Sequence, residues 1–177
     1  MKPRRLHSAL VAALALAAAA CNTSGCLDNR SSLPLAELCD SATGDAISLN
    51  ILEVHGIGAP ADSLLVAGGS SVSQLYLPMR ASRTSTAWCF HYTQEGIDDP
   101  AFNDTVAFTY ESIPFFASEE CGAMYQYRIK SCSTTTHLID SVVVADSLIT
   151  NVDIVRIRIY FRTQSDGPET PDTPDEG

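Results

Sequence analysis

The stretch IVRIRIYF, residues 154–161, decides the fold of this chain. Its apolar side chains recur at every second residue, and two arginines and a tyrosine fill the positions between them. Successive side chains of a β-strand point to opposite faces, so this pattern predicts a strand rather than a helix. We expect one face to pack in a core and the other, carrying Arg156, Arg158 and Tyr160, to face solvent.

The same alternation recurs along most of the chain. Segments rich in Asn, Asp, Gly and Pro separate the alternating stretches, and no long amphipathic helix competes with them. Roughly seven strands in about 120 residues predict an all-β domain, an antiparallel β-sandwich, with a small β-barrel as the alternative. The other six stretches are AISLNILEV (46–54), VSQLYLPM (72–79), TAWCFHY (86–92), DTVAFTYE (104–111), AMYQYRIKS (123–131) and HLIDSVVVA (137–145).

Shorter regions flank the predicted sandwich, which we place at residues 45–163. Residues 21–44 predict a tether and an irregular lead-in, in which only LPLAEL (33–38) indicates a short helix or an edge strand. Residues 164–177 contain five acids, three prolines and no large apolar side chain. Because they cannot bury enough apolar surface to fold, we expect a disordered acidic tail.

The first twenty residues have the composition of a secretory signal. Three basic residues precede an unbroken apolar run at residues 10–20. This run is shorter than the roughly 20 residues that a membrane-spanning helix needs, and it suits the core of a signal peptide. Small residues followed directly by Cys21 resemble a bacterial lipobox, in which the cysteine thiol receives a lipid. We expect a signal peptide at residues 1–20 and a lipid on Cys21; a plain signal peptide with an incidental cysteine is the alternative.

Charge argues against nucleic acid as a partner. The predicted signal holds three of the 11 basic residues and no acid, so 8 basic and 21 acidic residues remain, a net charge of −13. Such a surface repels phosphate backbones.

Export would place the remaining cysteines in an oxidising compartment, where disulfides persist. Their number is odd, so at least one thiol stays unpaired, and spacing alone assigns no pair. No CxxC or His-x-x-x-His pattern is present, which speaks against a zinc site. The five are Cys26, Cys39, Cys89, Cys121 and Cys132.

Residues for catalysis do not form a recognisable set. A cysteine nucleophile needs a lowered thiol pKa and a nearby base, whereas Glu119 and Glu120 would raise the pKa of Cys121. The candidate bases His55, His91 and His137 lie within or at the ends of predicted strands, and no G-x-S-x-G motif occurs. We therefore predict no cofactor and no enzyme, with a hydrolase as the least favoured alternative.

One acidic loop, EGIDDPAFND (95–104), offers oxygen ligands of the kind that calcium takes. The candidates are Asp98, Asp99, Asn103 and Asp104. The EF-hand spacing is absent, and the same residues are common in turns, where their side chains bond their own backbone. We predict a turn here, with a calcium site as the weaker alternative.

Aromatic side chains are further candidates for binding. Trp88, Phe90 and Tyr92 share one face of a predicted strand, and core packing is the simpler interpretation of them. In SIPFF (112–116), we expect Pro114 to bend the chain and expose its neighbours.

Several longer phrases carry a family resemblance: SSLPLAEL, GIGAPADSLL, SQLYLPMR, DDPAFNDTVAFTYES, FFASEECGAM and TTHLIDSVVVADSLITNVD. Together they resemble an uncharacterised family of small lipoproteins from gut Bacteroidales, a domain of unknown function. The resemblance implies a disulfide between Cys26 and Cys121, because cysteines recur at these two positions. Closing a loop of about 95 residues would stabilise the fold by up to about 4–5 kcal/mol in the chain-entropy model.

The tripeptide Asp-(Ser/Thr)-apolar occurs five times. It resembles the motif at which exported proteins of Bacteroidota carry O-glycans. The alternative is that these pairs begin strands through local hydrogen bonds. The candidate acceptors are Ser41, Ser63, Thr105, Ser141 and Ser147.

The sequence therefore predicts a lipid-anchored, non-catalytic protein of the cell envelope that binds a protein partner or helps to assemble a complex. A lipoprotein that binds a glycan or a small ligand is the alternative. Residues 22–25 hold no acid, whereas surface export in these bacteria is associated with acids directly after the lipid cysteine. We expect attachment to the outer membrane, facing the periplasm rather than the cell surface.

Overall fold

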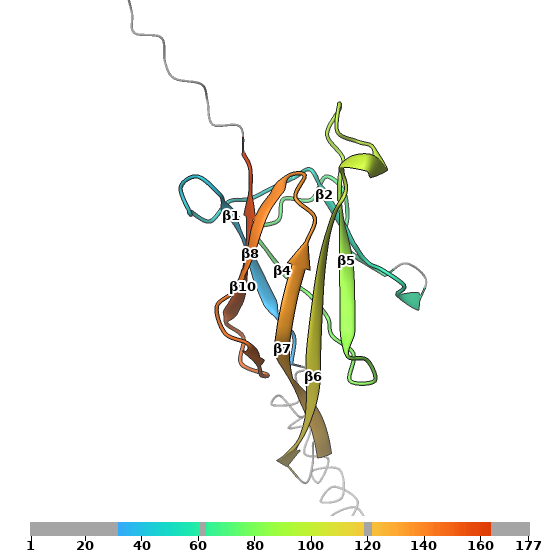
Figure 1. The fold of residues 1–177 in the computed structure, drawn as a ribbon, viewed down its shortest axis with the longest axis vertical. Helices are drawn as coiled ribbons and strands as arrows, with labels where there is room; N and C mark the ends of the chain where they lie inside the picture. Colours follow the sequence, from blue (N-terminus) through green and yellow to red (C-terminus); the bar gives the residue numbers. More distant parts are fainter. Residues whose placement is uncertain (1–31, 61–62, 119–121, 164–177) are drawn as a thin grey trace, which may run out of the picture.

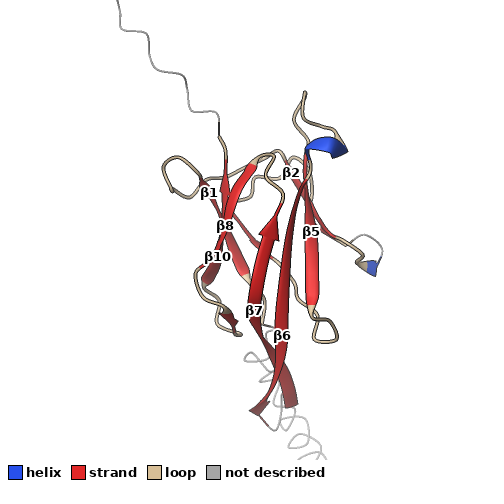
Figure 2. Cartoon of the chain, viewed as in Figure 1, coloured by secondary structure: helices blue, strands red, loops and turns tan. Residues whose placement is uncertain are grey.

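The computed structural model describes residues 32–60, 63–118 and 122–163, and in these residues the strands form two sheets (Figure 1, Figure 2). The predicted all-β sandwich is confirmed. One sheet has the order β4 (Gln74–Tyr76), β1 (Leu35–Asp40), β10 (Val155–Phe161), β8 (Ile139–Val144). The other has the order β3 (Leu64–Val66), β2 (Leu52–Gly56), β5 (Ser85–Tyr92), β6 (Asp104–Ser118), β7 (Gly122–Thr134), β9 (Leu148–Ile149).

Strand β10 follows the predicted alternation on its apolar face. Ile157, Ile159 and Phe161 are buried. The opposite face is less exposed to solvent than expected, because Arg156 is only 6% exposed. Its guanidinium forms an ion pair with Asp146 and donates a 3.0 Å hydrogen bond to the Thr150 hydroxyl, which satisfies a charge that burial would otherwise disfavour.

The lead-in contains a strand, so the strand alternative for LPLAEL is confirmed, whereas the expected irregular segment and the expected edge position are wrong there. Strand β1 lies inside its sheet, between β4 and β10, and Leu38 is fully buried. It runs parallel to β10, with Leu38 opposite Ile159. Nearly the whole domain separates these two strands in the chain, so no tight hairpin constrains them to be antiparallel.

Aromatic side chains of β5 fill the space between the sheets. Trp88, Phe90 and Tyr92 are buried, as the packing interpretation predicted. The Trp88 ring meets Phe108 of β6 edge-on, with centroids 5.5 Å apart. The Phe90 ring lies 6.5 Å from Phe161 of the opposite sheet. The first contact lies within the six-stranded sheet, and the second joins the two sheets through the core.

Strands β6 and β7 form a hairpin that extends beyond the neighbouring strands β5 and β9. Pairing of β6 with β5 ends at Thr109, and pairing of β7 with β9 begins at Tyr127. In the described residues, 112–118 and 122–126 therefore pair only with each other, and we call them the β6–β7 arm. The arm runs straight through Pro114, contrary to the expected bend, because proline is tolerated on a strand that has become an edge.

The arm projects from the end of the sandwich at which β1 begins (Figure 1), and we call this the proximal end. Leu35 pairs there with Tyr76 and with Val155. The Tyr76 hydroxyl donates a 2.8 Å hydrogen bond to Asp153, so the loop before β10 lies beside the start of β1. The proximal end thus gathers the start of β1, residues 76–84, residues 150–154 and the arm.

Candidate functional site

The most densely hydrogen-bonded acid in the described chain is Asp104, at the start of β6. Its side chain is fully buried. It accepts hydrogen bonds from the Tyr92 hydroxyl (2.6 Å) and the Thr135 hydroxyl (2.8 Å). Three backbone N–H groups, of residues 137, 138 and 139, also donate to it at 2.8 Å. Asp104 therefore fastens β5 and β6 of one sheet to the segment that enters β8 of the other.

These donors decide the charge state of Asp104. Burial alone would raise its pKa, but the N–H of Ile139, the Tyr92 hydroxyl and the other donors hold the pKa below its usual range. Burial and the neighbouring carboxylate in turn raise the pKa of Tyr92, which stays a neutral donor. The pair is a permanent structural element at neutral pH rather than an acid–base couple.

The four calcium candidates do not converge on one point. Asp99 caps the short 3-10 turn η2 (Pro100–Phe102) by accepting a 2.7 Å hydrogen bond from Ala101. Asp98 pairs with His91 at 3.2 Å. Asp104 faces the core through its donors, and within the described residues no cluster of three or more His, Cys, Asp and Glu side chains suits a metal ion. The loop geometry is that of the predicted turn.

A chain of polar contacts runs along the outer face of β5. His91 Nδ1 lies 2.8 Å from Asn103 Oδ1, and because an amide oxygen only accepts, the ring nitrogen donates. The Asn103 amide donates to the Cys89 sulfur at 3.4 Å. Cys89 and His91 share this face, but Asn103 stands between their reactive atoms.

The described thiols are poor nucleophiles. Cys39, Cys89 and Cys132 are free. Burial raises the pKa of Cys89 and of Cys39, and it raises the pKa of Cys132 to about 11. A protonated thiol does not attack a carbonyl at neutral pH. His55 lies opposite Cys89 across β2 and β5, but within the described residues no hydrogen bond joins His55 or His137 to any of these sulfurs.

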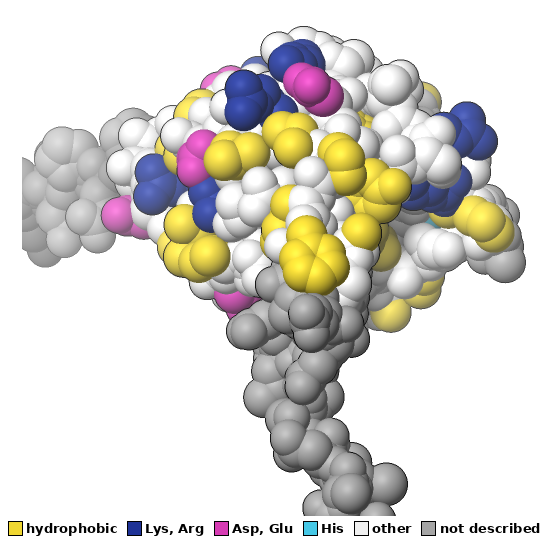
Figure 3. All heavy atoms as spheres, turned by 90° about the horizontal axis from the view of Figure 1, so that it is seen from below, with side chains coloured by type: hydrophobic (Ala, Val, Ile, Leu, Met, Phe, Trp, Pro, Cys, Tyr) yellow, Lys and Arg dark blue, Asp and Glu magenta, His cyan; other side chains and the backbone are white. Residues whose placement is uncertain are grey.

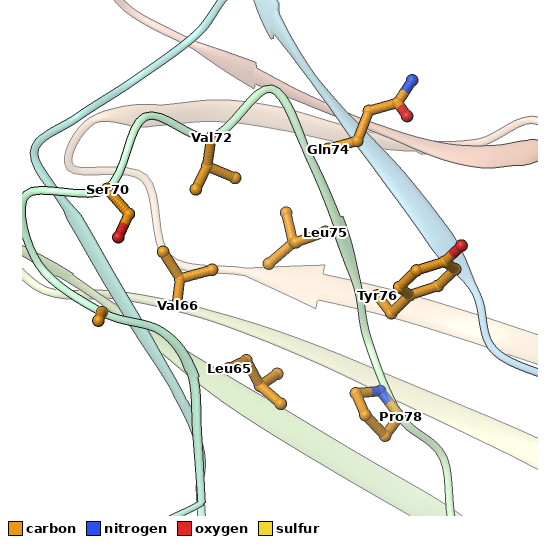
Figure 4. A pocket seen from close by; sticks show the side chains of 9 residues that line it. Leu65, Val66, Ser70, Val72, Gln74, Leu75, Tyr76 and Pro78 are labelled. Carbon is orange, nitrogen blue, oxygen red and sulfur yellow. The ribbon is translucent and has the colours of Figure 1, made fainter.

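An apolar groove opens between the edge strands β3 and β4, one from each sheet (Figure 4). Its volume is about 380 Å³. No titratable side chain other than Tyr76 lines it, and the polar lining consists of Ser70, Gln74 and the Tyr76 hydroxyl. The groove can therefore bury apolar groups but offers no acid–base chemistry. Its apolar lining includes Leu65, Val66, Val72, Leu75 and Pro78.

The aromatic candidates divide between core and surface. Tyr110 and Tyr127 meet edge-on in the core, with centroids 5.4 Å apart. Phe116 and Tyr125 are exposed on the arm. The register places Pro114 opposite Tyr125 and Phe116 opposite Ala123, so these four residues share one face of the arm. This apolar strip was missed because the sequence pattern suggested a break at Pro114.

The glycan candidates differ in exposure. Ser41, Ser63 and Ser147 are exposed, whereas Thr105 and Ser141 are half-buried on strands. Several of the aspartates that precede these candidates form local hydrogen bonds with the backbone, which explains the motif structurally. The Asp40 carboxylate accepts hydrogen bonds from the N–H groups of Ala42 and Thr43, at 2.8 and 2.7 Å.

Other predicted sites lie outside the described residues. These are the lipidation site Cys21, both halves of the Cys26–Cys121 pair, and the signal and tail segments. Among the described residues there is no helix with the length and apolar character to cross a membrane.

Comparison with known proteins places most of the sandwich in one family. The sequence profile of the family of unknown function DUF6452 matches residues 51–161, from β2 to the end of β10. No curated protein and no solved structure matches the chain. The predicted membership of a domain of unknown function is thus confirmed, while the lipid anchor and the bacterial group stay predictions. The match covers more than half of the chain and includes Asp104 and both strands of the arm, so the chain belongs to the family of unknown function DUF6452.

Proposed function

We propose that this protein is a lipid-anchored, non-catalytic module of the cell envelope that binds an extended apolar segment of a protein partner in the β3–β4 groove. The observation that carries the proposal is the groove itself, which lies between two edge strands and has an apolar lining. An edge strand presents backbone N–H and C=O groups to an incoming chain, and apolar pockets beside it receive alternate side chains.

The shape of the groove favours a chain over a compact ligand. The groove is open along its side, with half-buried Leu65 on one wall and exposed Pro78 on the other (Figure 4). An open groove cannot enclose most of a small molecule, whereas an extended peptide gains backbone hydrogen bonds as well as apolar burial.

The described polar residues support a binding role over catalysis. The Asp104 carboxylate is saturated by its donors, and burial raises the pKa of the Cys89 thiol. Asp98 and Asn103 both engage His91. None of these groups points into the β3–β4 groove.

Site-specific photocrosslinking in native membranes tests the proposal. A photoreactive amino acid at position 78 is expected to give a protein adduct of defined mass. The Leu65→Asp substitution in the same chain places a charge on the opposite wall and is expected to abolish that adduct while leaving the circular dichroism spectrum unchanged.

Position 143 supplies the matched control. Val143 is an exposed apolar residue on β8, the other edge of the β4-containing sheet. A photoreactive group there is expected to give no such adduct. Equal adducts from positions 78 and 143, or none from position 78, would contradict the proposed groove function.

A small apolar ligand in the same groove is the second candidate, because a volume of about 380 Å³ falls within the range of small-molecule pockets. An adduct at position 78 that carries a small molecule instead of a protein would favour it. The same result would count against the partner segment.

A further inference from the structure

The proximal end carries an unusual share of exposed apolar side chains. Phe116 is 68% exposed and Tyr125 43% exposed, both on the arm. Val152 and Ile154, in the loop before β10, are 56% and 49% exposed. Figure 3 looks onto this end and shows hydrophobic side chains across its middle, with charged side chains around them. Burial of such rings and methyl groups is favourable, so a surface of this kind indicates a contact.

The place where the described structure begins indicates what lies against the proximal end. The described structure begins at Ser32, which leads directly into β1 at the proximal end. If Cys21 carries the lipid, residues 22–31 are all that separates the bilayer from this end. Such a segment of ten residues reaches at most about 33–36 Å when fully extended, and about 16–19 Å as a flexible chain.

The arm is long enough to span the distance between the proximal end and the bilayer. Residues 110–118 of β6 extend about 31 Å beyond Thr109, the last residue that pairs with β5, at roughly 3.4 Å per residue. A bilayer held within the reach of the tether is therefore also within the reach of Phe116 and Tyr125. The opposite end, at Phe102, lies a full length of β6 away, and β6 has 15 residues.

We propose that the anchored protein lays its proximal end on its own phospholipid bilayer, with Phe116 and Tyr125 at the headgroup level. Aromatic rings favour this interfacial region. In the sequence, Glu119 and Glu120 lie between the two strands of the arm, and their charges oppose an anionic surface, so a zwitterionic bilayer is the preferred one. This inference rests on the lipid anchor of the proposed function.

Quenching of tryptophan by brominated lipid tests the docking. The full acylated chain is reconstituted into phosphatidylcholine vesicles as the Phe116→Trp or the Phe102→Trp variant. The native Trp88 is buried and provides a common background. Phe102 is a matched control, because it is 41% exposed but lies on η2 at the other end of β6. We expect at least twofold stronger quenching of the added emission for Phe116→Trp than for Phe102→Trp.

Equal quenching of the two tryptophan variants, or quenching that appears in native membranes but not in pure lipid, would overturn the docking. A chain that floats with vesicles but shows no quenching counts against docking alone, whereas a chain that never acquires the lipid counts against the proposed function.

Discussion

The Tyr92 hydroxyl donates a 2.6 Å hydrogen bond to the buried carboxylate of Asp104, and through Asp104 the two sheets of the sandwich are joined. The same carboxylate accepts from the N–H groups of the segment that enters β8. One side chain thus satisfies donors from three places in the chain. Its removal would leave those donors buried without an acceptor, which is more costly than the loss of one exposed contact.

Substitution of Asp104 is expected to destabilise the fold strongly. Asp104→Ala should lower the free energy of unfolding by about 3–5 kcal/mol, because it breaks a buried polar network. Tyr92→Phe should cost about 1–2 kcal/mol, since it removes one donor and leaves the carboxylate its other four. Urea unfolding followed by Trp88 fluorescence measures both. A loss below about 1 kcal/mol for Asp104→Ala would show that the network is not structural.

Acidic pH should remove the stabilisation of the fold that Asp104 contributes. Its pKa is lowered in the folded chain, so the stabilisation is fully present above the unfolded value of about 3.9 and is lost as pH falls through the folded pKa. We expect the stability difference between wild type and Asp104→Asn to shrink steadily below about pH 4. Urea midpoints measured from pH 6 to pH 2.5 test this, and a constant difference would contradict a lowered pKa.

The three described thiols and the predicted Cys26–Cys121 pair should differ in their reactivity. Burial raises the pKa values of Cys39, Cys89 and Cys132, so iodoacetamide at neutral pH is expected to label them only after unfolding. A peptide map without reductant is expected to show the Cys26 and Cys121 peptides joined. Alkylation of both of these thiols in the folded protein would refute the disulfide.

Glycans, if attached in the native host, should follow exposure. We expect hexose-bearing peptides at one or more of Ser41, Ser63 and Ser147, which are exposed. Thr105 and Ser141 are half-buried on strands and should stay bare. Glycopeptide mass spectrometry of the native protein, with the chain from a heterologous host as control, measures this. Bare peptides at all three exposed serines would exclude the modification.

Strands whose own residues alternate were predictable from sequence, and those defined by their partners were not. Strand β10 alternates over its whole length, and its apolar face is buried as expected. Strand β1 is short and follows Pro34, and its state depends on β10, whose residues are more than a hundred positions away. The sequence pattern therefore left a short helix and an edge strand open for it.

The candidate site was harder to predict because its contacts are distant in the chain. Asp104 has the sequence context of a turn, and the donors that define its role lie at residues 92 and 135–139. The arm was not predicted from the sequence for a related reason. Pro114 normally interrupts a strand, and only the end of β5 pairing at Thr109 makes β6 an edge that accepts it. In hindsight, a proline within an alternating aromatic stretch is the signal of such an edge.

Lipid attachment at Cys21 is the claim on which location, tethering and docking all rest. Metabolic labelling of the native host with an alkyne fatty acid tests it most directly, with wild type and Cys21→Ser compared side by side. We predict label on the wild-type chain and its recovery in the detergent phase, with both lost in the variant. An unlabelled wild-type chain, or a variant that partitions like wild type, would contradict the account.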